Sequence, residues 1–265
     1  RLKPLTDTTP KALLPVDGKP MLEHVILKLK DAGFDQITVN IHHFGQQIID
    51  FLKEKNNFGI DIHISDEREY LLDTGGGIKH AAEFLDGDEP FMVHNVDIFS
   101  NVDLRELYKK HLESNALATL LVSKRKTSRY LLFNREDKLC GWRNRETGEV
   151  KSYYPYFNPE QHKEYAFSGI HVISPDIFRW MEEWTGKFPI IQFYLSICAR
   201  ASILAYNAPG LKLLDVGKPE TLAEASSWIK ENSTVCKYCH IVLADYYREH
   251  PELPKDLYDK EDTLL

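Results

Sequence analysis

Along the first 123 residues, apolar side chains recur alternately at helical and at strand-like spacings. Residues 21–32 place Leu22, Val25, Ile26 and Leu29 on one helical face and end before Gly33, a residue that suits a helix C-cap. Residues 36–41 form a short β-branched run, which predicts a strand. The same criteria predict helices at 46–54, 78–84 and 104–114 and strands at 60–64, 91–96 and 118–123, with a glycine-rich segment at 74–77.

This alternation indicates βαβ units, in which parallel strands form a sheet covered by helices on both faces. The predicted fold class is therefore α/β, with Rossmann-like doubly wound layers around a mixed, mostly parallel sheet. Charged, aromatic and turn-forming residues mix over 124–164, which predicts a small β insertion. The βα pattern then resumes, with strands at 165–173 and 203–206 and helices at 175–184, 190–201 and 220–231.

The end of the chain has a different character. Residues 1–231 are predicted to form one domain, and the tyrosine-rich, charged residues 232–265 a C-terminal appendage with one short helix at 235–250. Within this appendage Cys236, Cys239 and His240 have the spacing of a haem attachment motif or of half a zinc site. No second cysteine pair or suitably spaced histidine pair accompanies them in the sequence, so a metal role is disfavoured.

Composition narrows the classes of function. With 43% hydrophobic residues the chain can build a sizeable core, and it has no run of about 18 apolar residues, so no membrane association is expected. A net charge of −7 argues against a general nucleic-acid binder, which needs a basic face. The chain opens with a polar stretch rather than a secretory leader, and its four cysteines form no disulfide framework, which together predict a cytoplasmic location.

The first candidate for chemistry is a loop over residues 1–21, punctuated by prolines, with cations at Arg1, Lys3, Lys11 and Lys19. Spaced cations on a rigid loop suit a triphosphate, whose charge must be offset while its oxygens stay oriented. The alternative is a solvated surface loop with scattered lysines.

The second candidate is the run Asp73, Thr74, Gly75, Gly76 and Gly77 ahead of a predicted helix. Three glycines allow a flat or anionic ligand to approach the backbone, beside the free N–H groups of a helix N-terminus. Their spacing matches neither a Walker A loop nor the dinucleotide fingerprint. A plain tight turn capped by Asp73 or Thr74 is the alternative.

Two carboxylates follow directly after apolar segments. Asp97 comes at the end of the strand predicted at 91–96, and Asp215 follows Leu213 and Leu214. In open parallel sheets the ligand crevice lies at the carboxyl ends of the strands. Mg²⁺ typically takes one or two carboxylates and completes its shell with water and phosphate oxygens, so these two acids are suited to share one Mg²⁺. The alternative is that Asp97 only caps the segment after it.

Taken in order, residues 1–21, 73–78, 95–97, 167–169 and 215–217 resemble the signature of the sugar-1-phosphate nucleotidylyltransferases. The resemblance covers residues 1–231. Residues 74–78 and 45–48 are especially similar to N-acetylmuramate-1-phosphate uridylyltransferases, with mannose-1-phosphate guanylyltransferases as near relatives. The resemblance implies the nucleotide-diphospho-sugar transferase fold and the transfer of a nucleotidyl group from an NTP, with UTP favoured, to a hexose or hexosamine 1-phosphate, with release of pyrophosphate.

The resemblance also implies roles for individual residues. Arg1 and Lys11 would grip the triphosphate and stabilise charge during transfer, and Asp97 and Asp215 would hold Mg²⁺; Lys19 occupies a motif position without a clear role. Glu67 would lie against the base with Asp73, Thr74, Gly75, Gly76 and Gly77, whereas Asn95, Ser168 and Gly169 would face the sugar phosphate. The partners implied are an NTP and a sugar 1-phosphate, as in the synthesis of cell-envelope precursors.

The aromatic cluster Tyr153, Tyr154, Tyr156 and Phe157 leaves the question of a homo-oligomer open. These side chains suit a contact between copies of the chain, the sugar side of a site, or a satellite hydrophobic cluster.

Two departures from the family pattern motivate a second hypothesis, a non-catalytic nucleotide-sugar sensor or subunit on the same fold. The family begins with a strand and a glycine-rich loop directly before the position of Arg1, and we expect both to be missing from this chain. Val96 stands where the family has the glycine of Asn-Gly-Asp, and its bulk is expected to narrow the sugar site.

Overall fold

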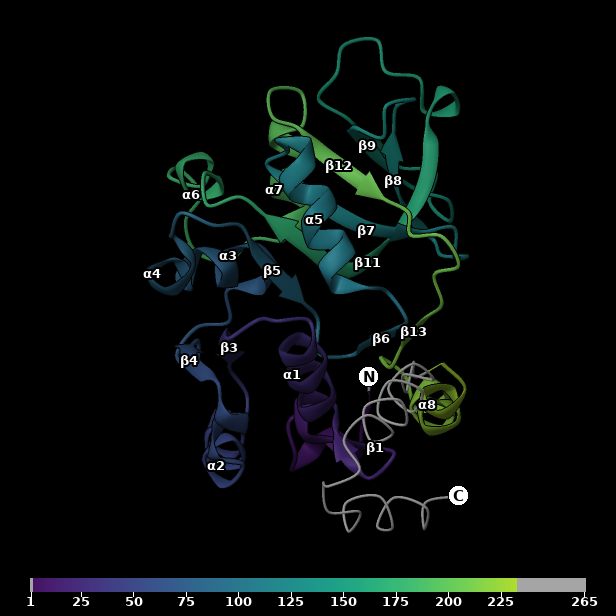
Figure 1. Ribbon diagram of the computed structural model, residues 1–265. Helices are drawn as coiled ribbons and strands as arrows, with labels where there is room; N and C mark the ends of the chain where they lie inside the picture. Colours follow the sequence, from purple (N-terminus) through teal and green to yellow (C-terminus); the bar gives the residue numbers. More distant parts are fainter. Residues whose placement is uncertain (1, 233–265) are drawn as a thin grey trace, which may run out of the picture.

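Strand β11 (Lys163–Ile173) is the centre of the main sheet of the computed structural model, which describes residues 2–232 (Figure 1). It pairs antiparallel with β5, β7 and β8, and the sheet order is β10–β9–β8–β11–β7–β12, with β5 also on β11. The remaining strands of this sheet are β5 (Phe91–His94), β7 (Ala118–Ser123), β8 (Arg129–Phe133), β9 (Leu139–Asn144), β10 (Val150–Lys151) and β12 (Ile203–Tyr206).

Strand direction confirms the predicted mixed sheet. Because β5 and β7 both oppose β11, and β12 is parallel to β7, the strands β5, β7 and β12 share one direction. Strands β8, β9 and β10 form an antiparallel extension of the sheet. This extension is the β insertion that the mixed composition of residues 124–164 predicts.

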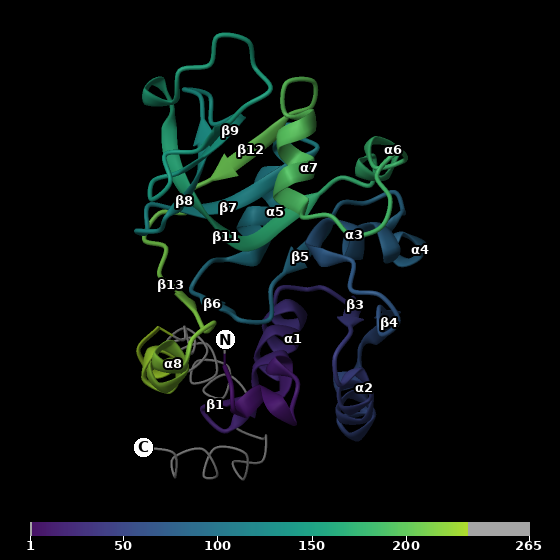
Figure 2. The ribbon, with the colours of Figure 1, turned by 180° about the vertical axis from the view of Figure 1, so that it is seen from behind.

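Helices cover both faces of the sheet, as the βα alternation predicts. On one face α1 (Met21–Asp31) and α5 (Leu104–Ser114) pack on Leu121, Ile170 and Val172. On the other face α3 (Asp73–His80) and α7 (Ile190–Ile197) pack on Leu120 and Val122. Helix α5 lies in front of the sheet in Figure 1, and α7 lies in front in Figure 2, where the molecule is turned by 180°. Successive side chains of β7 therefore pack into the hydrophobic cores on opposite faces of the sheet.

The parallel pair β3 (Gln36–Ile41) and β4 (Asp61–Asp66), joined through α2 (Gly45–Glu54) and η3 (Asn56–Gly59), stands apart from the main sheet. Within residues 2–232, β3 pairs only with β4, and β5 pairs only with β11. A cavity of about 880 Å³ lies between β3 and β5, lined by consecutive residues of both strands. This cavity therefore separates the β3–β4 pair from the main sheet, so that the sheet predicted from the sequence is divided into two parts.

The other elements are short except for α8, and they lie mainly around the N-terminal part of the fold and the β6–β13 pair. They are η1 (Leu5–Asp7), η2 (Lys11–Leu13), β1 (Pro15–Val16), β2 (Lys19–Pro20), α4 (Ala82–Leu85), β6 (Ile98–Ser100), η4 (Pro159–Gln161), α6 (Ile177–Trp180), β13 (Leu213–Asp215) and α8 (Pro219–Asn232). Strand β6 pairs with β13, and Figure 1 places this pair between α8 and the main sheet.

The glycine run belongs to a helix, whereas the sequence predicts a helix only from residue 78: α3 begins at Asp73 and contains Gly75, Gly76 and Gly77, all of them buried. Glycine disfavours helix, so local propensity points the wrong way. Packing decides instead, because a Cβ placed on Gly75 would lie 2.5 Å from the ring of Phe188. The missing side chains let α3 lie directly against the segment before α7.

The helix predicted at 175–184 is also shorter than expected, since α6 covers only Ile177–Trp180. The ammonium group of Lys79 accounts for its early end. It donates to the carbonyl oxygens of Met181 and Trp184, each at 2.7 Å, and to that of Glu182 at 3.1 Å. These carbonyls turn toward a side chain of α3 instead of continuing a helix.

Some predictions concern residues outside the described range. The appendage beyond Asn232, with its helix at 235–250 and with Cys236 and Cys239, lies outside it, and so does Arg1. Of the helices in residues 2–232, none is both long enough and apolar enough to cross a membrane.

Two buried histidines make the stability of the fold depend on pH. On α5, His111 has Nδ1 2.9 Å from Thr119 Oγ1 and Nε2 3.0 Å from Ser174 Oγ, and burial lowers its pKa to about 4. On β11, His171 Nδ1 lies 2.8 Å from the hydroxyl of Tyr194, and burial lowers the pKa of this histidine to about 3. Both imidazoles are therefore neutral in the folded chain at neutral pH.

We expect the free energy of unfolding to decrease as the pH falls below about 6.5, because the unfolded chain then binds protons that the folded chain does not. Each buried histidine contributes a loss of about 2 kcal/mol between pH 7 and pH 5. Urea unfolding at both pH values measures the loss. His111→Gln should reduce the difference between the two pH values, whereas the same change at exposed His43 should not. Equal pH dependence in all three chains would contradict this account.

Candidate active site

Lys11 and Asp97 form an ion pair although they are 86 residues apart in sequence. Pro10 precedes the short helix η2, which begins at Lys11, and Asp97 lies in the turn between β5 and β6. The pair is partly exposed, with 32% of the Lys11 side chain and 24% of the Asp97 side chain accessible. A cation and a carboxylate thus meet at the carboxyl end of β5, where the sequence predicts a ligand crevice.

Asp215 reaches the same place from the end of β13. That residue pairs with Ile98 in the β6–β13 ladder, and the backbone N of Val216 donates to Asp97 O at 2.8 Å. A Cβ placed on Gly217 would lie 2.8 Å from Asp215 Oδ1 and 3.9 Å from Lys11 Nζ. The absence of a side chain at Gly217 therefore lets the carboxylate of Asp215 lie against the backbone, close to the ammonium of Lys11.

The residues present fit a magnesium ion. Asp97 and Asp215 supply hard carboxylate oxygens on either side of Lys11, Asp97 in an ion pair with its ammonium group and Asp215 beside Gly217. No group of three or more His, Cys, Asp or Glu residues suited to a metal occurs in residues 2–232. A cation held here would take its other ligands from water and phosphate oxygens, the coordination typical of Mg²⁺ beside a nucleotide.

Asn95 and Gly169 form a second group next to the first. The backbone N of Asn95 donates to Gly169 O at 2.9 Å, and a Cβ placed on Gly169 would lie 2.8 Å from Asn95 Nδ2. Gly169 has a φ of +72° and sits in an irregular part of β11, where the register with β7 shifts. Ser168 beside it is fully buried, and its Oγ has no hydrogen-bond partner among residues 2–232.

The amides at the start of α3 are occupied by protein atoms. The backbone N atoms of Gly75 and Gly76 both donate to Phe188 O, at 2.9 and 3.1 Å. Thr74 remains exposed, its backbone N donates to Asp73 Oδ1 at 2.7 Å, and its Oγ1 accepts from the backbone N of Ile190 at 2.9 Å. At the start of α3, Thr74 is therefore exposed and Asp73 half-buried, whereas the glycine amides are occupied.

Gly75→Ala is expected to destabilise the chain by about 2 kcal/mol, because the new Cβ would lie 2.5 Å from the Phe188 ring and 2.9 Å from its carbonyl oxygen. This loss corresponds to a fall in Tm of roughly 4–8 °C for a chain of this size. Gly87→Ala is the matched control, since a Cβ there meets nothing within 4 Å. A thermal melt with the same Tm for both variants would show that α3 does not depend on this contact.

Glu67 belongs to a third group with Asn40 and Gly77. Only 3% of Glu67 is exposed, and its carboxylate contacts the Asn40 amide at the end of β3. Asn40 is absent from the residues that the sequence singles out. Its position, a polar residue near the end of an apolar strand, is the same signal that identifies Asp97.

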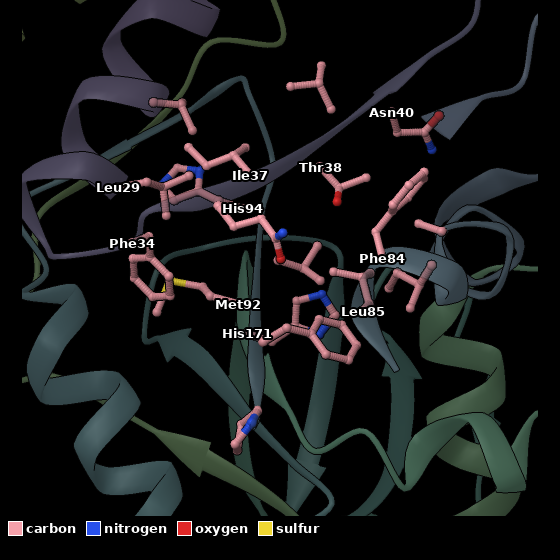
Figure 3. A pocket seen from close by; sticks show the side chains of 18 of the residues that line it. Leu29, Phe34, Ile37, Thr38, Asn40, Phe84, Leu85, Met92, His94 and His171 are labelled. Atoms are coloured by element: carbon pink, nitrogen blue, oxygen red, sulfur yellow. The ribbon is translucent and has the colours of Figure 1, made fainter. Parts of the chain in front are cut away.

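One cavity reaches parts of the second and third groups. The space between β3 and β5 is lined by Thr38 and Asn40 on one side and by Met92 and His94 on the other (Figure 3). Its wall also includes the site residues Thr74, Gly77 and Asn95, and Ala12 next to Lys11. Thr74 and Gly77 of the predicted nucleotide residues and Asn95 of the predicted sugar residues thus border a common space, whereas Lys11, Asp97 and Asp215 are not part of its lining.

Val96 packs against several apolar clusters at once. Its side chain contacts the cluster of Leu2, Val16 and Phe99, and the clusters around α1 as well. Val96 also lines the cavity between β3 and β5, as Asn95 does, so the narrowing of the sugar site by its bulk stays a prediction.

Other predicted cations lie elsewhere. Lys19 is exposed on β2, and Lys3 pairs with Asp7 at 3.6 Å. Of the aromatic cluster, Tyr153 and Tyr156 are exposed, whereas Tyr154 packs on the main core and donates its hydroxyl to Cys198 O at 2.8 Å. The structure thus brings together Lys11, Asp97 and Asp215 from the residues that the sequence predicts for phosphate and metal.

Comparison with known proteins agrees with this geometry. A family model described as "Nucleotidyl transferase" matches residues 1–232. An N-acetylmuramate alpha-1-phosphate uridylyltransferase of Neisseria meningitidis is 41% identical over 109 residues, which are 41% of this chain and 47% of that protein. A probable mannose-1-phosphate guanylyltransferase of Oryza sativa is 30% identical over 226 residues, 83% of this chain and 58% of that protein.

Among solved structures, a UDP-glucose pyrophosphorylase in complex with UDP-glucose superposes with a TM-score of 0.67 at 18% identity. The match covers 87% of this chain and 94% of that chain. It supports the predicted nucleotide-diphospho-sugar transferase fold. The chain spans about half the length of the curated relatives described above.

Proposed function

The chain belongs to the nucleotidyl transferase family, and from that premise we propose that it transfers a nucleotidyl group from an NTP to a sugar 1-phosphate. In this reaction a phosphate oxygen of the sugar phosphate forms a bond to the α-phosphorus of the NTP, and the bond to the β-phosphate breaks, releasing pyrophosphate. The observation that carries the proposal is the meeting of Lys11, Asp97 and Asp215 around Gly217.

Electrostatics accounts for what these residues do. The sugar phosphate is already an anionic nucleophile, so the reaction needs no strong general base. The obstacle is the approach of one anion to the phosphorus of another, and a cation held in place lowers that repulsion. Lys11 supplies such a charge from a rigid, proline-preceded helix, and we propose the same role for Arg1. His94, three residues before Asp97, is neutral because burial lowers its pKa to about 4.

We assign Asp97 and Asp215 as the ligands of Mg²⁺. When bound, the ion supplies charge to the phosphate oxygens and lowers the repulsion between the reactants. Lys11 pairs with the carboxylate of Asp97. The observations that support this assignment are the bond from Val216 N to Asp97 O, which brings the two segments together, and the position of Asp215 close to Lys11.

The groups around Asn95 and around Glu67 are the proposed binding sites of the two substrates. Asn95, Ser168 and Gly169 are proposed to face the sugar phosphate, and Asp73 to Gly77 with Glu67 to form the nucleotide side of the cavity. UTP is the proposed nucleotide, since a uridylyltransferase is 41% identical over its matched segment. A hexose or hexosamine 1-phosphate is the proposed acceptor.

We also propose which part of the chain carries the activity, in which compartment, and with which partners. Residues 1–231 would carry the activity, and residues 232–265 would form an appendage to it. A reducing compartment such as the cytoplasm suits the buried free thiols of Cys140 and Cys198. The partners proposed are the two small-molecule substrates, without nucleic acid or membrane.

The test is a panel of four NTPs against several sugar 1-phosphates, with pyrophosphate release measured with and without Mg²⁺. We expect turnover that requires Mg²⁺ and is highest with UTP and a hexosamine or hexose 1-phosphate. Turnover with GTP alone would overturn the nucleotide preference. Tight nucleotide-sugar binding without turnover on any pair would overturn the enzyme and favour the non-catalytic sensor.

A further inference from the structure

The carboxylate of Glu67 lies where three segments meet. Its Oε1 accepts a hydrogen bond from Asn40 Nδ2 at 2.6 Å, and its Oε2 accepts one from the backbone N of Leu72 at 2.9 Å. The backbone of Glu67 adds a bond from its N to Ile41 O at 2.8 Å, and its O lies 2.7 Å from His42 Nδ1. One residue therefore links the end of β3, the end of β4 and the residue before α3.

This pair of side chains also sets how close α3 comes to β3. A Cβ placed on Gly77 would lie 2.5 Å from Glu67 Oε1 and 2.6 Å from Asn40 Nδ2. The backbone of α3 thus rests directly on the hydrogen bond between Glu67 and Asn40. Asn40 and Gly77 both line the cavity between β3 and β5, and Figure 3 shows Asn40 at its edge.

We infer that Glu67 is a positioning residue for the nucleotide and not a residue that contacts the base. The inference deepens the proposed function and rests on it. Glu67 is 3% exposed, and each of its carboxylate oxygens is already bonded within the chain. It acts through Asn40 and through the start of α3, where Thr74 is exposed and Asp73 half-buried on the nucleotide side.

The positioning role depends on complementary hydrogen bonds rather than on negative charge, and this difference can be tested. Asn40→Asp places a second carboxylate against Glu67, and two facing carboxylates repel each other. Glu67→Gln keeps an oxygen for the Leu72 amide, and the Asn40 amide can turn to present its own oxygen to the new NH₂ group. The double variant Asn40→Asp, Glu67→Gln restores the pair with donor and acceptor exchanged.

The experiment measures UTP affinity by calorimetry, steady-state kinetics, and hydrogen exchange at the Leu72 amide. Asn40→Asp is expected to weaken UTP binding by about tenfold or more and to raise KM with little change in kcat, because like charges separate the pair. It should also accelerate exchange at Leu72. The UTP affinities of Glu67→Gln and of the double variant should stay within about threefold of that of the unchanged chain. Asn56→Asp on η3 adds the same charge at an exposed position and serves as the control.

Two results would overturn the inference. If Glu67→Gln alone weakens UTP binding tenfold and the double variant is not rescued, the charge of Glu67 acts on the nucleotide directly. If Asn40→Asp changes neither UTP affinity nor Leu72 exchange, the pair positions nothing. Calorimetry with UTP requires no turnover, so a chain that binds UTP without releasing pyrophosphate would refute the proposed function and still decide the role of Glu67.

Discussion

Asp97→Asn is expected to lower the rate of nucleotidyl transfer by about 10²–10³-fold while changing Tm by no more than a few degrees. The change keeps the shape of the side chain and removes the charge that faces Lys11. A neutral amide is a weaker ligand for Mg²⁺, so the metal would bind less tightly and stabilise less charge in the transition state. Steady-state kinetics at several Mg²⁺ concentrations separates the two effects.

Asp215→Asn should act in the same direction, because its carboxylate is the second proposed ligand. Asp86→Asn is the matched control: Asp86 is exposed, lies in the loop before β5, and should leave turnover unchanged. Full turnover in both Asp97→Asn and Asp215→Asn would refute the assignment of these acids to the metal. A loss of folding in Asp97→Asn, seen as a large fall in Tm, would show that the ion pair with Lys11 is structural.

Many helices and strands could be predicted from the local spacing of apolar residues, and particular elements show why. The strand β3 and the helices α1 and α5 have bounds within a residue of those predicted, because their apolar spacing and their burial coincide. Helix α3 could not be predicted, since its glycines are favoured only by the close approach of Phe188 and of the Glu67–Asn40 pair. Phe188 lies more than 100 residues from Gly75 in sequence, and Asn40 more than 30 residues from Gly77.

The candidate site also combines features set by local sequence with features set by contacts between distant segments. Asp97 and Asp215 could be predicted because each follows an apolar segment, and such ends gather at one edge of a sheet. That the two meet at one place depends on the pairing of β6 with β13 and on the bond from Val216 N to Asp97 O, which no local pattern encodes. Asn40 carried a weaker form of the same signal, a single amide without a motif around it.

Lys11→Met gives the most discriminating prediction, because it should change metal binding and turnover in opposite directions. Lys11 compensates Asp97 in the chain without ligands, so its removal leaves a carboxylate without that cation and should strengthen Mg²⁺ binding in the absence of nucleotide. The same change removes a positive charge proposed to face the triphosphate, and turnover should fall by about 10²-fold. Lys11→Arg keeps the charge with a different shape and should retain an intermediate rate.

Titration with Mn²⁺ as a paramagnetic probe measures the first effect, and pyrophosphate release measures the second. Both effects require that Lys11 exchange partners, from Asp97 in the free chain to phosphate oxygens in the complex. Weaker metal binding in Lys11→Met would show that the lysine supports the metal site instead of competing with the ion for Asp97. Unchanged turnover would show that the lysine only balances Asp97, and the cationic role would then have to come from another residue of the loop.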